Sequence, residues 1–411
     1  MRNITSIMLL MLVVSCSPPT VSTETQGLVL PPDITYRAGG AKNAVDVDLA
    51  TLRPSDTCGA WVSGLSAGGV HVVPASGCLI KSAIILSKPT SIVGNGATLY
   101  FTDSGRMDIE ADNCSISDSF LVWDRAALLH SSYSMLIRVN ADGMAIKGNT
   151  FLTSFDDSAR SMSEIPTGKG PWAWLVRNRG GGRASLSNIE VSGNRMTNVY
   201  WYSVGVMYVS VPANLVVVSD NIVRFHNAGF YATDCTDCEF SWNRMLRVSS
   251  TNFYLSGKRL AVKNNRILYH GNSTAGDGVA LSNASDAVIS YNEIRGGGCY
   301  ATPLYGTTNN VRISNNTFAA GITTAIYIPS TSAANNIEIF NNIFSASRAL
   351  GVLAYNVNGL SIIENVFHDQ LGRESTLVNC TDVKYKNNLS SEPYDAAGTR
   401  APWGSNMTLY K

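Results

Sequence analysis

The chain has 411 residues, of which 45% are hydrophobic and only 15% are charged. A disordered chain is excluded because this apolar content can bury a sizeable core. A polytopic membrane protein is excluded because no run of about 20 apolar residues follows residue 16. Lys and Arg number 31 against 30 Asp and Glu, so nonspecific nucleic-acid binding, which needs a basic surface, finds no support.

The N-terminus has the pattern of an export signal. One positive charge precedes an apolar stretch at residues 7–14, which is too short to span a bilayer. Residues 13–16, Val-Val-Ser-Cys, resemble a bacterial lipobox, in which cleavage before the Cys accompanies its lipidation. This resemblance predicts a lipoprotein-type signal peptide at 1–16 with Cys16 lipidated, followed by a Pro/Thr/Ser-rich tether at 17–45. An ordinary secretory signal is the alternative.

The cellular location follows from the same motif. By resemblance to Gram-negative lipoproteins, Ser17 after the Cys favours the outer membrane over the inner one. The sequence predicts an outer-membrane or cell-surface lipoprotein, with a periplasmic or extracellular protein as the alternative. Membrane contact is expected only through the lipid anchor.

Two pairs of cysteines stand out by their spacing. Cys58 and Cys78 flank a short candidate strand region and could form a disulfide in an exported protein. Cys235 and Cys238 have the spacing of half a zinc site or of a redox pair, but no second Cys or His pair accompanies them. The strand-rich context instead favours the interpretation that Cys235 and Cys238 are small side chains buried in the core.

An asparagine repeat runs through most of the chain. Each unit reads apolar-x-apolar-x-x-Asn-x-apolar, although the last lacks its final apolar residue, and the repeated residues are Asn149, Asn194, Asn221, Asn243, Asn265, Asn292, Asn316, Asn342, Asn365 and Asn388. The spacing from Asn194 onward averages about 24 residues. The apolar pair before each Asn alternates with period two, which is strand spacing. One unit cannot close a core alone, so we expect stacked coils whose Asn side chains bond to their neighbours.

These repeats resemble the right-handed parallel β-helix superfamily, the pectin-lyase-like fold. The resemblance covers about residues 55–390 and includes the glycine-containing segments 68–74 and 94–99. It implies an all-β, single-stranded right-handed parallel β-helix of about 12 coils. The expected divisions are an N-terminal cap with the first coils at 46–100 and the β-helix at 101–390.

Two segments depart from the repeat. The gap between Asn149 and Asn194 exceeds one coil and predicts an inserted loop at about 154–186. Residues 391–411 continue no repeat and are expected to form a C-terminal tail. Leucine-rich repeats, the competing architecture, need several leucines per unit and a helix signal, and neither is seen.

The resemblance leaves the reaction open, since the superfamily includes polysaccharide lyases, hydrolases, epimerases, phage tailspikes and adhesins. The strings typical of polygalacturonases and of calcium-dependent pectate lyases are absent. A hydrolase would need two carboxylates about 5–10 Å apart, for which Asp234 with Asp237, or Asp277 with a neighbouring acid, are candidates. Such residues more often bond their own backbone in turns.

An apolar-Tyr pair recurs in four of the strands that follow the repeated Asn residues. The apolar members, expected to point inward, are Phe230, Phe253, Leu304 and Ile326, and the outward members are Tyr231, Tyr254, Tyr305 and Tyr327. Ala280 takes the tyrosine position between them. A column of exposed tyrosines would suit stacking against a sugar chain. The alternative is that aromatic residues simply favour strands.

Cationic and proton-transferring residues gather in the neighbouring loops. From four successive coils come Arg224, His226, Arg247, Tyr269, His270 and Arg295. Lyases of uronic-acid polymers need a cation at the carboxylate, a base for the adjacent proton and an acid for the leaving oxygen. The candidates are His226 or His270 as base, Tyr269 as acid, and Arg224 with Arg247 as the clamp. A solvated basic edge is the alternative.

The leading prediction is an exported protein that binds an acidic polysaccharide and cleaves it by β-elimination. Asp277 and Arg295 join the tyrosine column as predicted substrate-binding residues. A non-catalytic adhesin for glycan or protein and a tailspike-like depolymerase are the alternatives, and the export signal disfavours the second. No cofactor is predicted; calcium stays open, although no calcium motif occurs. The sugar, the linkage and the oligomeric state stay open.

Overall fold

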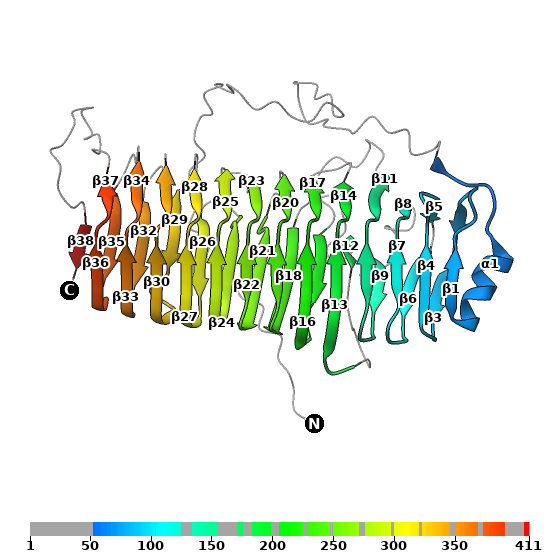
Figure 1. Ribbon diagram of the computed structural model, residues 1–411, viewed down its shortest axis with the longest axis horizontal. Helices are drawn as coiled ribbons and strands as arrows, with labels where there is room; N and C mark the ends of the chain where they lie inside the picture. The colour runs from blue at the N-terminus through cyan, green and yellow to red at the C-terminus, as the bar shows by residue number, and fades with distance from the viewer. Residues whose placement is uncertain are drawn as a thin grey trace, which may run out of the picture.

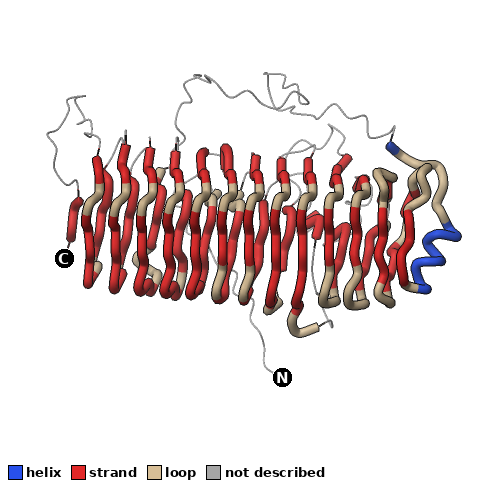
Figure 2. Tube along the Cα trace, viewed as in Figure 1, coloured by secondary structure: helices blue, strands red, loops and turns tan. Residues whose placement is uncertain are grey.

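The computed structural model describes most of the chain beyond the tether. The described residues are 52–102, 104–124, 134–154, 171–175, 183–198, 205–209, 211–224, 228–246, 248, 250–270, 276–296, 300–319, 323–345, 350–368, 373–390 and 407–410. They form a rod of stacked coils in which all strand pairs are parallel (Figures 1 and 2). The all-β, right-handed parallel β-helix expected from the sequence is confirmed.

Each coil contributes strands to three faces, which we name the tyrosine face, the middle face and the short-strand sheet. The tyrosine face consists of β3 (Ala83–Leu86), β6 (Arg106–Ile109), β9 (Ser134–Val139), β12 (Pro171–Leu175), β15 (Gly205–Val209), β18 (Ala228–Thr236), β21 (Phe253–Lys258), the start of β24 (Val279–Ser290), β26 (Tyr300–Tyr305), β29 (Thr324–Ile328), β32 (Leu350–Tyr355), β35 (Arg373–Val378) and β38 (Met407–Tyr410). The middle face consists of β1 (Gly69–Val72), β4 (Thr90–Val93), β7 (Ser115–Ser117), β10 (Ala145–Lys147), β13 (Leu186–Ser192), β16 (Ala213–Ser219), β19 (Glu239–Ser241), β22 (Ala261–Lys263), the end of β24, β27 (Thr307–Ser314), β30 (Ala333–Phe340), β33 (Val357–Ile363) and β36 (Thr381–Lys386).

The short-strand sheet has 13 strands, one from each coil. They are β2 (Cys78–Ile80), β5 (Thr98–Phe101), β8 (Phe120–Asp124), β11 (Thr150–Ser154), β14 (Arg195–Asn198), β17 (Ile222–Arg224), β20 (Arg244–Leu246), β23 (Arg266–His270), β25 (Glu293–Gly296), β28 (Thr317–Ala319), β31 (Ile343–Ser345), β34 (Val366–His368) and β37 (Leu389–Ser390). Within a coil the chain runs from the tyrosine face to the middle face and then to the short-strand sheet.

The core is a column of inward side chains, because strand alternation points every second residue into the coil. In β21, Phe253 and Leu255 are buried whereas Tyr254 between them is partly exposed. Inward rings also stack from coil to coil, and the centroids of Phe318, Phe344 and Phe367 lie 5.1 and 4.7 Å apart. Removing one such ring would cost about 3–5 kcal/mol.

The asparagine ladder occupies the corner between the middle face and the short-strand sheet. The side-chain amide of each Asn from Asn149 to Asn365 donates to the Oδ1 atom of the next coil's Asn, at 2.9–3.2 Å. The same amide donates to a backbone carbonyl, as in the 2.8 Å bond from Asn265 Nδ2 to the Phe240 oxygen. The predicted stacking of these ten residues up to Asn388 is confirmed.

Two short helices lie at the N-terminal end of the rod, and four of the cysteines form disulfides. Helix α1 (Gly59–Gly64) and the 3-10 helix η2 (Leu65–Ala67) lie at the N-terminal end (Figure 1). The expected disulfide Cys58–Cys78 is present. Cys235 and Cys238 are buried as expected, but the interpretation as simple hydrophobic residues is wrong, because they form a disulfide with each other. The short segment between them brings the two sulfurs together.

Two predicted boundaries need correction. Strand β12 lies inside the expected loop at 154–186 and pairs with β9 and β15, so this part of the insertion completes a coil. Strand β38 lies inside the expected tail and pairs with β35. The signal peptide and the tether lie outside the described residues. In the part of the chain that the structure describes, no helix has the length and hydropathy needed to cross a bilayer.

Candidate functional site

A row of tyrosines runs along the tyrosine face through three successive coils. The strand register places Tyr208 beside Tyr231 and Tyr231 beside Tyr254. Their inward neighbours Phe230 and Phe253 are fully buried, so the alternation expected from the sequence holds. The next position in the row is Ala280, as predicted.

Tyr305 does not lie in this row. Its register partner in the preceding coil is Ser282, two residues beyond Ala280, whereas Tyr327 pairs with Pro303 and continues the row. The expectation of a single column of four tyrosines is therefore wrong for Tyr305. The physical reason is that the sequence pattern fixes which side of a strand a residue faces but not how far the strand is shifted along the coil.

The tyrosine rings stack mainly on one another. The ring centroids of Tyr231 and Tyr254 lie 5.4 Å apart with an interplanar angle of 21°, and those of Tyr300 and Tyr327 lie 4.2 Å apart at 18°. Faces that are covered by a neighbouring ring cannot also stack on a sugar. The stacked rings therefore offer mostly their edges and phenol groups to a ligand.

Asp277 lies among these tyrosines. The Tyr305 hydroxyl donates a hydrogen bond of 3.2 Å to the Asp277 carboxylate. Burial raises the pKa of Asp277 to about 7, although the bond from Tyr305 acts in the opposite direction. Burial and then the Asp277 charge raise the pKa of Tyr305, so this phenol stays protonated. The pair thus holds one group that titrates near neutrality and one that keeps its proton.

The wider surroundings of Asp277 connect three coils. The Asn252 backbone N–H and side-chain amide both donate to the Asp277 carbonyl, at 2.9 and 3.2 Å. Asp277 also forms an isolated bridge with Tyr300 in the next coil. Its charge contributes to raising the pKa of Tyr231, although burial is the larger cause there.

Several buried polar atoms have no hydrogen-bond partner among the described residues, and two of them belong to residues that bear on this site. One is Oδ1 of Asn252, whose side chain is fully buried, and the other is Nε of Arg224 at the end of β17. Buried polar atoms are usually paired, because an unpaired one carries its full desolvation penalty. Each atom therefore marks a place where the described residues leave a hydrogen-bonding group without a partner.

The other predicted site residues are only partly placed. His226 and Arg247 lie outside the described residues, as do the side chains of Tyr269 and His270, whose backbone belongs to β23. Arg224 and Arg295 occupy one row of the short-strand sheet, three strands apart. Arg295 forms an ion pair of 2.5 Å with Glu293, which compensates its charge.

The alternative of two hydrolytic carboxylates gains no support from the described residues. Asp237 accepts two hydrogen bonds from Arg259, which lower its pKa and hold it as a charged surface partner. The pKa of Asp277 responds to burial and to Tyr305, and no described carboxylate contributes to its shift. No described carboxylate therefore shows the electrostatic coupling to Asp277 that a closely spaced pair of acids would have.

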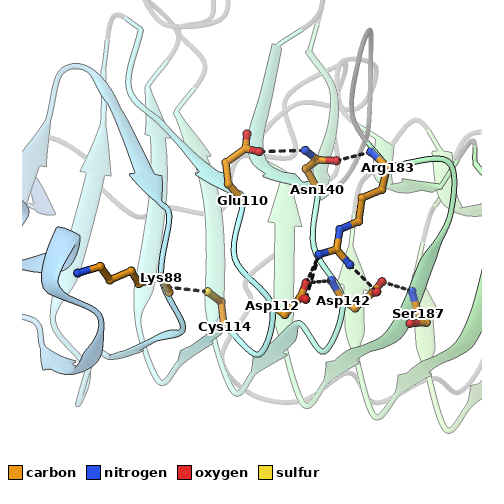
Figure 3. Close-up of polar contacts among 8 residues, drawn as sticks. All are labelled: Lys88, Glu110, Asp112, Cys114, Asn140, Asp142, Arg183 and Ser187. Carbon is orange, nitrogen blue, oxygen red and sulfur yellow. Dashed lines mark hydrogen bonds and ion pairs between the residues drawn. The ribbon is translucent and has the colours of Figure 1, made fainter.

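Acidic residues do gather at another corner, between the tyrosine face and the middle face. Figure 3 shows Arg183 reaching both Asp112 and Asp142, with N···O distances of 2.7 and 2.6 Å. The Arg183 backbone N–H donates to Asn140, which in turn donates to Glu110. This network fixes the chain where it returns from the insertion. No group of three or more potential metal ligands occurs among the described residues.

Sequence reasoning missed several residues of this site. Tyr208 repeats the apolar-Tyr pattern one coil earlier and could have been found from it. Tyr300 and Asn252 could not, because their contacts with Tyr327 and Asp277 join different coils. Sequence spacing alone does not give the register that creates such contacts.

Comparisons with known proteins agree with the architecture. A family model described as a right-handed β-helix region matches residues 209–367. The alginate lyase AlyF-OU02, solved as a ligand complex, is 12% identical with a TM-score of 0.51, covering 89% of this chain and 96% of that one. A further alginate lyase, solved with a trisaccharide, is 11% identical with a TM-score of 0.50, covering 87% of this chain and 92% of that one.

At these identities the structural likeness concerns the fold. A search of curated protein sequences gave no significant match. The strand register, the family model and the structural neighbours all describe the same architecture, so the chain folds as a right-handed parallel β-helix. The tyrosine face of this β-helix carries the hydrogen-bonded pair of Asp277 and Tyr305.

Proposed function

We propose that this protein binds an acidic polysaccharide across the tyrosine face and cleaves it by β-elimination. The observation that carries the proposal is the Asp277–Tyr305 pair, in which a phenol that keeps its proton contacts a carboxyl with a pKa of about 7. A proton donor held beside a group that titrates near neutral pH suits transfer to a leaving oxygen.

The residues take complementary roles in this reaction. A base, His226 or His270, removes the proton beside the sugar carboxylate, and the electrons of that bond form the double bond of the unsaturated product. The bond to the bridging oxygen breaks, and this oxygen takes the Tyr305 proton. Protonated Asp277 then returns a proton to Tyr305. In this scheme Tyr305 replaces Tyr269 as the acid, because its contact with Asp277 is defined.

Arg224 is the proposed partner of the sugar carboxylate, together with Arg247. The Nε–H group of Arg224, which has no partner among the described residues, would donate a charge-assisted hydrogen bond to a bound uronate. The stacked tyrosines Tyr231, Tyr254 and Tyr327 would contact the sugar hydroxyls through their phenol groups and ring edges. Asp277 and Arg295 would contact the same bound polysaccharide from its two sides.

The test is incubation of the purified protein with sodium alginate, polygalacturonate and a neutral glucan. Alginate enters the panel because the two structural neighbours are alginate lyases. We expect ultraviolet absorbance of an unsaturated product with at least one acidic polymer and none with the glucan. Reducing ends without this absorbance would indicate hydrolysis. Binding to an acidic polymer without any new chain ends would favour the adhesin.

Export and lipid anchoring belong to the same proposal. Residues 13–16 have the lipobox pattern, and a lipid on Cys16 would supply the free energy that holds the protein at a membrane. We expect Cys16→Ser to move the protein from the membrane fraction to the soluble fraction. A wild-type protein that is already soluble and still begins before residue 16 would contradict this part of the proposal.

A further inference from the structure

A second row of side chains, outside the tyrosine face, follows the asparagine ladder. The residue before each ladder position has a left-handed backbone, with φ between 51° and 65°. These residues are Gly148, Gly193, Asp220, Trp242, Asn264, Tyr291, Asn315, Asn341, Glu364 and Asn387. We call them the corner row. Most are Gly, Asn or Asp, which tolerate this conformation best.

Two members of the corner row are bulky aromatic residues in a conformation that disfavours them. Trp242 has φ 59° and Tyr291 has φ 57°. Their side chains are also exposed, Trp242 by 59% and Tyr291 by 62%, so burial of the rings does not offset the backbone strain. Neither ring stacks on another described ring, in contrast to the tyrosine face. Their faces are open to a ligand.

The positions of the two rings suit a chain that runs along the rod. Asn264 lies between Trp242 and Tyr291, so the rings are two strand spacings apart, about 9.6 Å. This is close to the length of two sugar units. Beyond Tyr291 the row continues with Asn315 and Asn341, whose side-chain amides bond to each other at 2.7 Å. Alternating rings and amides can meet the apolar faces and the hydroxyls of successive sugars.

The neighbouring strands place two arginines next to each other on the same coils. Arg244 lies two residues after Trp242, and its register partner in the next coil is Arg266. Like charges opposite each other destabilise a sheet. Arg266 is compensated on its other side by Glu293, at 2.7 Å. No ion pair joins Arg244 to an acid in the described part of the chain. An anion beside Trp242 would relieve this repulsion.

We propose that the corner row from Trp242 to Asn341 is a second, non-catalytic binding site for a carboxylate-bearing polysaccharide. Trp242 and Tyr291 stack on alternate sugars, the intervening amides bond hydroxyl groups, and Arg244 with Arg266 holds a sugar carboxylate. Two independently unfavourable features, strained exposed rings and paired cations, coincide on these coils, and bound glycan compensates both. The site binds without turnover, so it does not depend on the proposed lyase activity.

The central test is the double variant Trp242→Asn/Tyr291→Asn, prepared together with Tyr305→Phe so that polymer is not consumed. Asn is the residue that the left-handed backbone prefers, and neighbouring members of the row already carry it. We expect affinity for sodium alginate or polygalacturonate to fall by at least about tenfold, on the scale of lost aromatic stacking. We also expect the thermal unfolding midpoint to rise, because the strain is removed.

A matched control separates the corner row from general surface effects. Val70 is an exposed apolar residue of β1 in the first coil, 73% accessible, and lies outside the corner row and the strands beside it. Val70→Thr should leave affinity unchanged. Arg244→Gln should weaken binding to the acidic polymers, flatten its salt dependence and leave binding to a neutral glucan unchanged.

Three results would overturn the inference. The first is unchanged affinity in the double variant, and the second is a fall in its unfolding midpoint, which would assign the rings a structural role. The third is an absence of wild-type binding to both acidic polymers in affinity electrophoresis. Loss of product formation in Tyr305→Phe with corner binding retained would separate this site from the proposed active site.

Discussion

The asparagine ladder and the tyrosine face are both rows of side chains built coil by coil, but they differ in how strictly they repeat. The ladder carries Asn in ten positions, and each amide from Asn149 to Asn365 bonds the next Asn. The tyrosine face changes at Ala280 and Pro303 and includes the ionisable Asp277. In this fold, residues that repeat strictly from coil to coil therefore stabilise the structure. Positions that depart from the repeat are the candidates for a functional site.

The two rows also differ in how completely their polar atoms are paired. An amide of the ladder is neutral and finds all its partners within the coil stack, so its burial costs little. Asp277 instead has a carboxyl whose neutral form is favoured by burial, and the Oδ1 atom of Asn252 beside it has no partner among the described residues. The tyrosine face thus accepts a stability cost that the ladder avoids.

The largest expected effect comes from removing the proton donor of the tyrosine face. Tyr305→Phe keeps the ring but removes the hydroxyl that bonds Asp277. We expect turnover of the cleaved polymer to fall about 10²–10⁴-fold with binding nearly unchanged, as for loss of a general acid. The measurement is product absorbance beside a binding isotherm. Tyr355→Phe, in β32 of the same face, is the control. An equal loss of turnover in this variant would show that the effect is not specific to Tyr305.

A charge-removing change at Asp277 tests the electrostatic difference between the rows. The folded pKa of about 7 lies above the ordinary aspartate pKa of 3.8, so the folded state holds the proton more tightly. The contribution of Asp277 to stability should therefore be greatest at low pH and decline as the pH rises from about 4 to about 7. Asp277→Asn should abolish this decline and stabilise the protein by roughly 2–4 kcal/mol above pH 7.

The same variant makes a prediction for activity. If protonated Asp277 returns a proton to Tyr305, wild-type turnover should fall as the pH rises above about 7. In Asp277→Asn the turnover rate should no longer show this fall above pH 7. The measurements are denaturant unfolding and the rate of product formation between about pH 5 and 9. A difference in unfolding free energy between the wild type and Asp277→Asn that stays constant over the acidic interval would contradict the raised pKa.

A substitution within the ladder should cost stability at every pH. Asn265→Ala removes the acceptor of the Asn243 backbone and side-chain N–H groups, and leaves the Phe240 carbonyl without its donor. We expect a loss of about 1–3 kcal/mol in the free energy of unfolding, without pH dependence. Asn388→Ala is the control, because Asn388 is half-buried and its amide donates to the Ile362 carbonyl but to no further ladder Asn among the described residues. Equal losses at both sites would argue against a continuous ladder.

The sequence was sufficient for the ladder because a side chain that plays the same role in every coil leaves a periodic signal. Asn at a fixed offset from an apolar pair predicts both the strand and the stacked side chain. The inward direction of Phe230 and Phe253 followed from the same alternation. The ladder and the inward phenylalanines both follow from a pattern that every coil repeats, and the structure confirms both.

The candidate site was less predictable because it depends on differences between coils. Tyr305 shares the outward direction of Tyr327 but lies in a different row, since the strand shift is not encoded in alternation. The raised pKa of Asp277 arises from burial among residues of other coils. The Cys235–Cys238 disulfide was missed because spacing does not separate a bonded pair from two buried thiols.

The smallest effect is expected at the Arg183 network, which also joins successive coils but does so at the surface. Arg183 bonds Asp112 and Asp142, and the pKa of Asp112 is lowered first by the Asp142 backbone N–H and then by Arg183. Because water and salt screen exposed ion pairs, Arg183→Gln should shift the unfolding midpoint much less than Asn265→Ala, and less again at high salt. Thermal unfolding at low and high ionic strength measures this, with Arg259→Gln as a second exposed pair for comparison. A loss as large as that of the ladder variant would mean that the return from the insertion, rather than the buried amides alone, holds neighbouring coils together.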